Sequence, residues 1–135
     1  MDNLTKAQRK KNMQHIKSKN TKPEMILRLK LWHKGLRYRK NYLPLIGKPD
    51  IVFVRQKIAI FVDGDFWHGK DLSKIKKQVK SNRSYWIHKI QRNMERDKEV
   101  NDSLTADGWL VLRFWESDIK LNTDDCVENI CSYLP

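Results

Sequence analysis

Carboxylates flank two short apolar runs in the middle of the chain. Asp50 precedes the run Ile51–Val54, and Asp63 follows the run Ile58–Val62, with a further acid at Asp65. A polar turn separates the runs, so we expect an antiparallel hairpin that returns both acidic ends to one edge. Acidic oxygens that converge at the edge of a buried sheet are suitable ligands for Mg²⁺. The segment therefore predicts a magnesium site.

Another carboxylate occupies a position where an apolar side chain is expected. The chain from Ser84 to about Ala106 is predicted to be one long helix, whose core-facing stripe is Trp86, Ile90, Asn93, Asp97, Val100 and Leu104. A buried carboxylate is unfavourable unless it is paired. Asp97 should therefore pair with an internal arginine or backbone group, or hold a histidine and raise its basicity. His68 is the best candidate among the histidines because it follows the acidic strand end.

Glu24 has two alternative roles at the start of the first predicted helix. Thr21 suits the N-cap and Pro23 the first turn, and Glu24 lies at capping-box spacing. Gly35 ends this helix. The apolar face of the helix is assigned to Ile26, Leu27, Leu29, Leu31 and Trp32. Either Glu24 only caps the helix, or it reaches a metal-bound water where the helix abuts the sheet.

An aromatic pair, Phe66 and Trp67, follows the second acidic strand end. Such pairs usually pack in a core, but Gly64 and Gly69 flank this one and its neighbours are polar. Exposed aromatic side chains in a basic protein can stack on bases or wedge between them. We therefore treat the pair as a candidate DNA contact.

The chain is strongly basic, and its N-terminus contributes to this charge. The 135 residues carry a formal net charge of +12, which favours nucleic acid over a membrane surface as the anionic partner. Residues 1–20 are interpreted as an arm that tracks phosphates rather than a fraying end. Its candidate contacts are Lys10, Lys11, Lys17 and the apolar Met13, which could also wedge between bases.

Two further features indicate where the protein works. We find no apolar stretch long enough to span a bilayer and no signal peptide, so a cytoplasmic protein is expected, associated with the nucleoid when it binds DNA. Cys126 and Cys131 do not make a disulfide framework or a zinc site, and both are expected to be reduced core residues.

The order of predicted elements indicates an α/β fold. An edge strand is expected over residues 36–43, a weakly structured basic connection over 70–83, a strand over 109–115 and a final helix over 124–133. Together with the hairpin and the long helix, this order predicts a mixed sheet with helices on both faces. Residues 21–135 should form a single domain behind the arm.

With these residues in view, the chain resembles the very-short-patch repair endonucleases, which have the restriction-endonuclease-like PD-(D/E)xK fold. The resemblance covers about residues 8–120. The matching segments are Lys11-Asn12-Met13, Asn20–Glu24, Gly47-Lys48-Pro49-Asp50, Phe66-Trp67-His68, Asn93-x-Glu95-Arg96-Asp97, and Gly108-Trp109 through Trp115-Glu116. These segments are specific only when taken together.

The resemblance implies an enzyme that nicks one strand of duplex DNA beside the T of a T·G mismatch, which arises by deamination of 5-methylcytosine. It implies that Asp50 and the backbone carbonyl of Val62 bind Mg²⁺, and that Glu24 acts through metal-bound water. His68 would be the general base, with Asp97 orienting it. Met13, Phe66 and Trp67 would wedge into the DNA beside the mismatch.

The chain also departs from the family pattern, which includes a structural zinc site. The zinc-ligand positions hold Asp65, Lys70, Leu72 and Ser117, so no zinc is expected, and Asp65 is predicted to stiffen the loop by pairing with a nearby lysine. Asp63 replaces a histidine that helps at the phosphate, so it either joins the metal site or weakens phosphate binding. The lysine of the general scheme is missing after Asp63, which leaves His68 as the base.

Two other functions remain open from the sequence. The chain could be a restriction-type or other structure-specific endonuclease on the same fold, or a catalytically silent DNA-binding module. The set of Asp50, His68 and Asp97 argues against the silent module, because binding alone needs no carboxylate on an apolar stripe. Mismatch-repair proteins are possible partners, and a monomer is expected.

Overall fold

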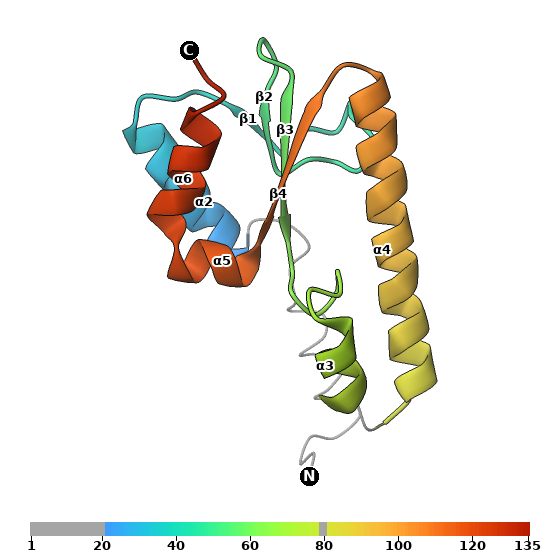
Figure 1. The fold of residues 1–135 in the computed structure, drawn as a ribbon. Coiled ribbons are helices and arrows are strands. Elements are labelled where there is room, and N and C mark those ends of the chain that lie inside the picture. The colour runs from blue at the N-terminus through green and yellow to red at the C-terminus, as the bar shows by residue number, and fades with distance from the viewer. Residues whose placement is uncertain (1–20, 79–80) are drawn as a thin grey trace.

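The computed structural model of the chain describes residues 21–78 and 81–135. Its sheet contains β1 (Arg39–Lys40), β2 (Ile51–Phe53), β3 (Ile58–Asp63) and β4 (Leu110–Trp115), in that spatial order (Figure 1). The pairs β1–β2 and β2–β3 are antiparallel, whereas β4 runs parallel to β3. A parallel pair needs a long crossover, and α3 (Leu72–Gln78) and α4 (Arg83–Ala106) lie within it.

Helices cover both faces of this sheet. Helices α2 (Lys22–His33), α5 (Glu116–Leu121) and α6 (Thr123–Cys131) lie on one side, and α4 runs along the other (Figure 1). The larger core, on the α2 side, includes Leu27, Leu31, Ile51, Ile58, Ile60, Ile119, Val127 and Ile130. The smaller core, under α4, comprises Ala59, Phe61, Val100 and Leu104.

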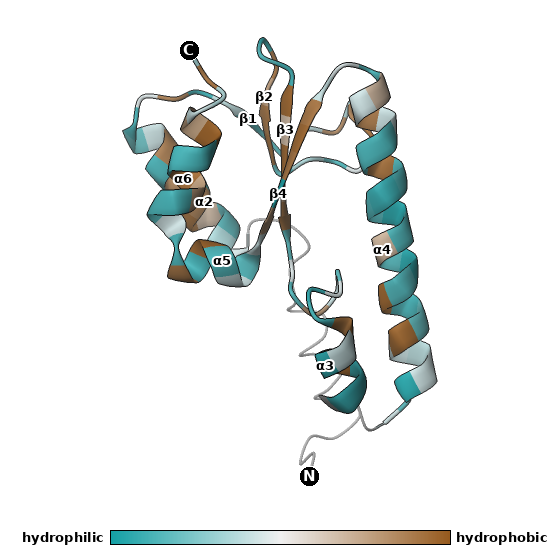
Figure 2. Cartoon of the chain, in the orientation of Figure 1, coloured by the Kyte–Doolittle hydropathy of each residue, from teal (hydrophilic) through white to brown (hydrophobic). Residues whose placement is uncertain are grey.

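Strand β3 is the buried centre of both layers. From Ile58 to Phe61 its side chains are at most 6% exposed, and they alternate between the two cores. Figure 2 shows β2, β3 and β4 as an apolar centre, whereas α4 is hydrophilic over much of its length. Burial on both faces explains why β3 reads as a continuous apolar run in the sequence.

The predicted fold class is confirmed, with differences in three elements. The edge strand expected over 36–43 is only the two residues of β1. The connection expected over 70–83 contains α3, in which Ile75 is buried. A helix, α5, follows β4 directly and precedes α6, so the C-terminal part contains two helices where one was expected.

The apolar face assigned to α2 was partly wrong. Leu29 and Trp32 are 58% and 49% exposed, whereas the buried stripe pairs Leu27 and Leu31 with the charged Glu24 and Arg28. Positions separated by three and four residues share one helix face, and here that face carries an ion pair. Apolar residue types alone therefore pointed to the wrong side of the helix.

The remaining helical features concern the termini and the cysteines. Thr21 is the N-cap of α2 but its side chain makes no capping hydrogen bond, and α4 starts at Arg83, one residue before the expected Ser84. Cys126 and Cys131 are free thiols that pack on the larger core, as predicted. No helix in the described part of the chain is both long enough and apolar enough to cross a membrane.

Gly47 fixes the turn that leads into Asp50. Its φ is +80°, and an added Cβ would lie 2.6 Å from Val100 Cγ1 on α4. Gly35 has a similar φ of +84°, but nothing lies within 4 Å of an added Cβ. A side chain at either glycine would strain the backbone, but only a side chain at Gly47 would also clash with a neighbour.

We predict that Gly47→Ala destabilises the domain more than Gly35→Ala. Left-handed backbone costs a non-glycine residue about 1 kcal/mol at either site, and overpacking adds about 1–3 kcal/mol at Gly47 alone. Urea unfolding of both variants measures the difference. Equal losses of unfolding free energy would show that the turn does not pack on α4 as described.

Candidate active site

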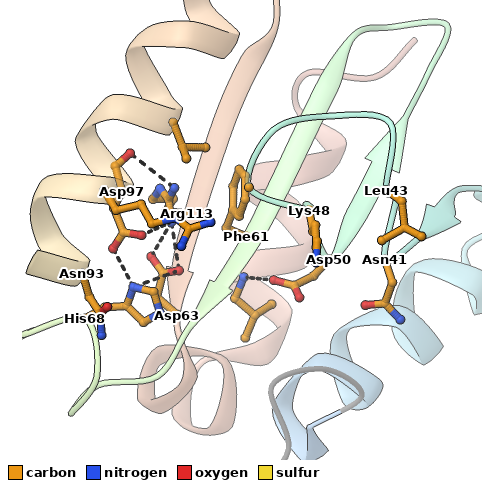
Figure 3. A pocket seen from close by; sticks show the side chains of 14 residues that line it. Asn41, Leu43, Lys48, Asp50, Phe61, Asp63, His68, Asn93, Asp97 and Arg113 are labelled. Atoms are coloured by element: carbon orange, nitrogen blue, oxygen red, sulfur yellow. Dashed lines mark hydrogen bonds and ion pairs between the residues drawn. The ribbon is translucent and has the colours of Figure 1, made fainter. Parts of the chain in front are cut away.

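One pocket is lined by Asp50, Val62, Asp63, His68 and Asp97, which are all the predicted catalytic and metal-binding residues except Glu24. It has a volume of about 510 Å³ and opens beside the acidic ends of β2 and β3 (Figure 3). Asp50 and Lys48 lie on one side of it, and Asp63, His68, Asp97 and Arg113 gather on the other. The pocket therefore joins the hairpin, the loop after β3, α4 and β4.

The hairpin register places Asp50 beside the end of β3. Ile51 pairs with Ile60, and the backbone N–H of Asp50 donates to the Ile60 carbonyl at 3.0 Å. The Asp50 carboxylate then accepts a hydrogen bond from the Val62 N–H at 2.6 Å. The predicted convergence of the two acidic ends is thus present.

Asp50 is an electrostatically unfavourable carboxylate. Burial raises its pKa to about 7, and the negative charges of Glu24 and Asp63 add to that rise. The Val62 N–H and the Arg28 charge act in the opposite direction without cancelling it. Positive charge brought to Asp50 would therefore stabilise its ionised form.

Glu24 reaches this side of the sheet from α2. Its side chain is buried, at 1% exposure, with Oε1 at 3.6 Å from Nη1 of Arg28. Its charge is close enough to raise the pKa of Asp50. This position agrees with the alternative in which the helix abuts the site, and the role of Glu24 stays a prediction.

His68 and Asp97 form the pair that the helix stripe suggested. His68 Nδ1 lies 2.5 Å from Asp97 Oδ2, so with a protonated Nδ1 the imidazole donates to the carboxylate and leaves Nε2 as the basic nitrogen. Burial lowers the pKa of His68, but the hydrogen bond to Asp97 and the charges of Asp63 and Asp97 outweigh it, so the net shift is upward. The arrangement can take a proton from a water molecule at Nε2.

The loop that carries His68 is fixed to α4. Asn93, the other polar residue of the stripe, donates from Nδ2 to the Trp67 carbonyl at 3.0 Å. Gly69 packs so closely that an added Cβ would lie 2.6 Å from Met94 Sδ. Both polar anomalies of the long helix therefore hold the same loop.

Asp63 is paired with an arginine that the sequence analysis did not single out. Arg113 Nη1 donates to both carboxylate oxygens of Asp63, at 3.0 and 3.2 Å. Burial raises the pKa of Asp63, against the lowering effect of Arg113 and His68. Arg113 also lies 3.5 Å from Asp97 Oδ1, so Asp97 has both the histidine and the internal arginine that were weighed as alternatives. The sequence signal that could have identified Arg113 is its position as a cation within an otherwise apolar predicted strand.

The acidic side chains provide two candidate metal sites, and they differ in fit. Ligand atoms of Asp63, His68 and Asp97 lie within 4.8 Å of one another, as a cation site requires. Arg113 already supplies positive charge to both of these carboxylates, however. Asp50 fits a cation better, because burial, together with the charges of Glu24 and Asp63, raises its pKa to about 7 and Arg28 offsets this only in part. Asp50 and the Val62 carbonyl stay the predicted ligands.

Aromatic side chains form a cluster next to the pocket. Phe66 is 38% exposed and meets Trp67 edge to face, with ring centroids 5.2 Å apart. Trp86, assigned to the helix stripe in the sequence, lies 5.5 Å from Trp67 by ring centroids, and Lys89 Nζ lies 5.4 Å from the Trp67 ring. The cluster offers stacking surface and positive charge together. Trp86 and Lys89 are additions to the predicted DNA contacts.

Polar contacts fix the loop where the zinc ligands were expected to be replaced. The Asp65 carboxylate accepts a hydrogen bond from the Ser117 N–H at 3.2 Å, at the start of α5. Lys70 Nζ donates to Ser117 Oγ at 2.5 Å and lies 3.3 Å from Asp118 Oδ1. The lysine thus pairs with Asp118 rather than with the predicted Asp65.

The arm residues Lys10, Lys11, Met13 and Lys17, which were predicted to contact DNA, lie outside the residues that the structure describes.

Comparisons with known proteins show which sequences the whole chain is similar to. A family model described as DNA mismatch endonuclease Vsr matches residues 1–74. The chain is 54% identical to the type II nicking enzyme V.NmeDIP of Neisseria meningitidis serogroup C, over 96% of this chain and 88% of that protein. It is also 54% identical to the type II nicking enzyme V.HpaIIP of Haemophilus parainfluenzae, over 92% and 89% respectively.

A more distant relative is named as a mismatch endonuclease. The DNA mismatch endonuclease Vsr of Escherichia coli K12 is 36% identical over 85% of this chain and 73% of that protein. These relatives are nucleases, which confirms the predicted endonuclease class at the level of the family. The chain belongs to the Vsr family of DNA mismatch endonucleases.

Proposed function

We propose that this protein is a Mg²⁺-dependent endonuclease that nicks one strand of duplex DNA beside the T of a T·G mismatch, in very-short-patch repair. The observation that carries the catalytic part is the 2.5 Å contact between His68 Nδ1 and Asp97 Oδ2, in the same pocket as Asp50. Family membership supports the substrate class.

The residues of the pocket divide the work between them. Asp50 and the Val62 carbonyl would hold Mg²⁺, with Glu24 acting from the neighbouring helix. When bound, the ion supplies positive charge against the phosphate and the leaving oxygen. His68 takes a proton from the attacking water at Nε2, while Asp97 fixes the ring and stabilises the imidazolium.

Binding of the duplex would extend from the pocket over neighbouring surfaces. The cluster of Phe66, Trp67 and Trp86 would stack against bases, and Lys89 adds a cation beside the rings. The basic arm, through Lys10, Lys11, Lys17 and Met13, would hold the backbone and contribute to a steep salt dependence. A monomer suffices for this arrangement, and recruitment by mismatch-repair proteins remains a prediction.

A restriction-type nuclease on the same fold is the second candidate. The type II nicking enzymes among the relatives favour testing it, since their names state nicking and not the mismatch. The two functions differ in whether a fully matched duplex is cut. A silent binding module is disfavoured by the oriented histidine.

The substrate is tested by nicking assays on two labelled duplexes that differ only by one T·G mismatch, in varied flanking contexts. We expect a Mg²⁺-dependent nick beside the mismatched T, abolished by EDTA and by Asp50→Asn, with DNA binding retained. Asp124→Asn is the matched control, because Asp124 pairs with Lys30 on the surface away from the pocket. Equal cutting of the matched duplex would favour the restriction-type enzyme, and full activity of Asp50→Asn would refute the metal assignment.

The general base is tested by removing the imidazole. His68→Ala should reduce the single-turnover nicking rate by about 100- to 10,000-fold, the usual contribution of a positioned base. His33→Ala provides the control, since His33 is an exposed residue in the last turn of α2. A loss of less than about tenfold would remove His68 from this role.

The pH dependence of nicking tests the partnership with Asp97. A base works when deprotonated, so the rate should rise with pH and level off above the raised pKa of His68. Asp97 raises that pKa, so Asp97→Asn should shift the rise to lower pH and reduce the plateau. Profiles recorded at two Mg²⁺ concentrations separate this shift from ionisation linked to the metal. Identical midpoints in both enzymes would contradict the pairing.

A further inference from the structure

Two carboxylates face one imidazole nitrogen in the pocket. His68 Nδ1 lies 2.5 Å from Asp97 Oδ2 and 3.8 Å from Asp63 Oδ1. A short turn of the ring would exchange one partner for the other, and with it the direction of Nε2. Something must therefore select Asp97.

Arg113 pairs with Asp63, the carboxylate that competes with Asp97 for His68. Its Nη1 donates to both oxygens of Asp63, and its Nε donates to Asn101 Oδ1 at 2.6 Å. A carboxylate that already accepts two charge-assisted hydrogen bonds is a weaker acceptor for a third donor. The same Nη1 lies farther from Asp97, at 3.5 Å from Oδ1, so Arg113 engages Asp63 more closely and leaves Asp97 Oδ2 to His68.

The arginine itself has little freedom. It is placed by the parallel register of β3 and β4, in which Arg113 pairs with Phe61, and its guanidinium carbon lies 4.1 Å from the Phe61 ring centroid. Its Nη2 lies 3.5 Å from the Asp97 carbonyl, and its side chain is 18% exposed. Because its donors already have partners on β3 and α4, a positioning role fits better than direct contact with a phosphate.

We infer that Arg113 is a positioning residue for the proposed nicking reaction, which keeps His68 on Asp97 by occupying Asp63. The inference rests on the proposed function of His68 as the base. It also assigns a role to Asp63, which is the acceptor that holds Arg113. The pair Asp63–Arg113 acts as one unit.

A double-mutant cycle tests this unit. Arg113→Met leaves Asp63 free to compete for His68, and it should lower the single-turnover nicking rate about 10- to 100-fold, the scale of a misplaced catalytic group. In an Asp63→Asn background the competitor is already weakened, so adding Arg113→Met should cost less than about threefold. The dissociation constant for mismatched DNA should stay within about threefold throughout.

Controls keep structural loss separate from misplacement. Arg37→Met removes an exposed arginine that stacks on Trp32 outside the pocket, and it should leave the rate unchanged. Arg113→Lys preserves a charge near Asp63 if Arg113→Met fails to fold, and it should give an intermediate rate. Thermal melting of every variant confirms folding.

Proton NMR of His68 gives a readout that needs neither DNA nor Mg²⁺. The Nδ1–H proton bonded to Asp97 should give a low-field resonance, assigned by its loss in Asp97→Asn. It should shift or disappear in Arg113→Met and return in the double variant. This signal tests Arg113 even if wild-type protein fails to nick the mismatch, which would refute only the proposed function.

Two results would overturn the inference. The first is wild-type nicking by Arg113→Met together with an unchanged resonance. The second is an equal loss of rate from Arg113→Met with and without Asp63→Asn, which would show that Arg113 acts independently of Asp63.

Discussion

Negative charge buried at one end of β3 is the constraint on which the site depends. Glu24, Asp50, Asp63 and Asp97 all lie around this end, and burial with mutual repulsion raises the pKa of Asp50 to about 7. The basic partners Arg28, Arg113 and His68 offset part of this repulsion. The pKa of Asp50 stays raised to about 7 despite Arg28, and a cation that stabilises its ionised form is therefore reasonable there.

The fold assembles this cluster from opposite directions. Strand β2 is antiparallel to β3, so the start of β2 lies beside the end of β3. Strand β4 is parallel to β3 and places Arg113 alongside Phe61. The crossover between β3 and β4 contains α4, which contributes Asp97 to the other side of the pocket (Figure 3). Four segments of the chain, from the hairpin, the loop after β3, α4 and β4, therefore meet at this pocket.

The sequence was informative where one rule dominated. The acidic strand ends and the polar break in the α4 stripe identified Asp50, His68 and Asp97, because hairpins and helices have fixed periods. The sequence was less informative where an apolar side chain could be either buried or exposed. Leu29 and Trp32 are apolar but exposed on α2, since the buried face of that helix accommodates the Glu24–Arg28 pair. Residue type alone does not show which face a neighbour will cover.

Arg113 shows the same difficulty at the site. The run from Trp109 to Trp115 correctly predicted a strand, but its one cation has no local partner in the sequence. Its partner Asp63 is 50 residues away, and only the strand pairing brings them together. Asp63 stood out in the sequence as an acidic strand end, but its pairing with Arg113 is apparent only as a contact in the structure.

The stability of Asp50→Asn in Mg²⁺-free solution tests the central claim most directly. An aspartate whose folded pKa is raised contributes stability below its unfolded value of 3.8, and this is lost as the pH rises through about 7. At pH 8 the neutral asparagine, which can still accept the Val62 N–H, should therefore raise the unfolding free energy, by up to about 4 kcal/mol. The gain should narrow toward pH 4, and the stabilised variant should not nick DNA. A variant no more stable than wild type at pH 8 would contradict the account of a charge held at the expense of folding.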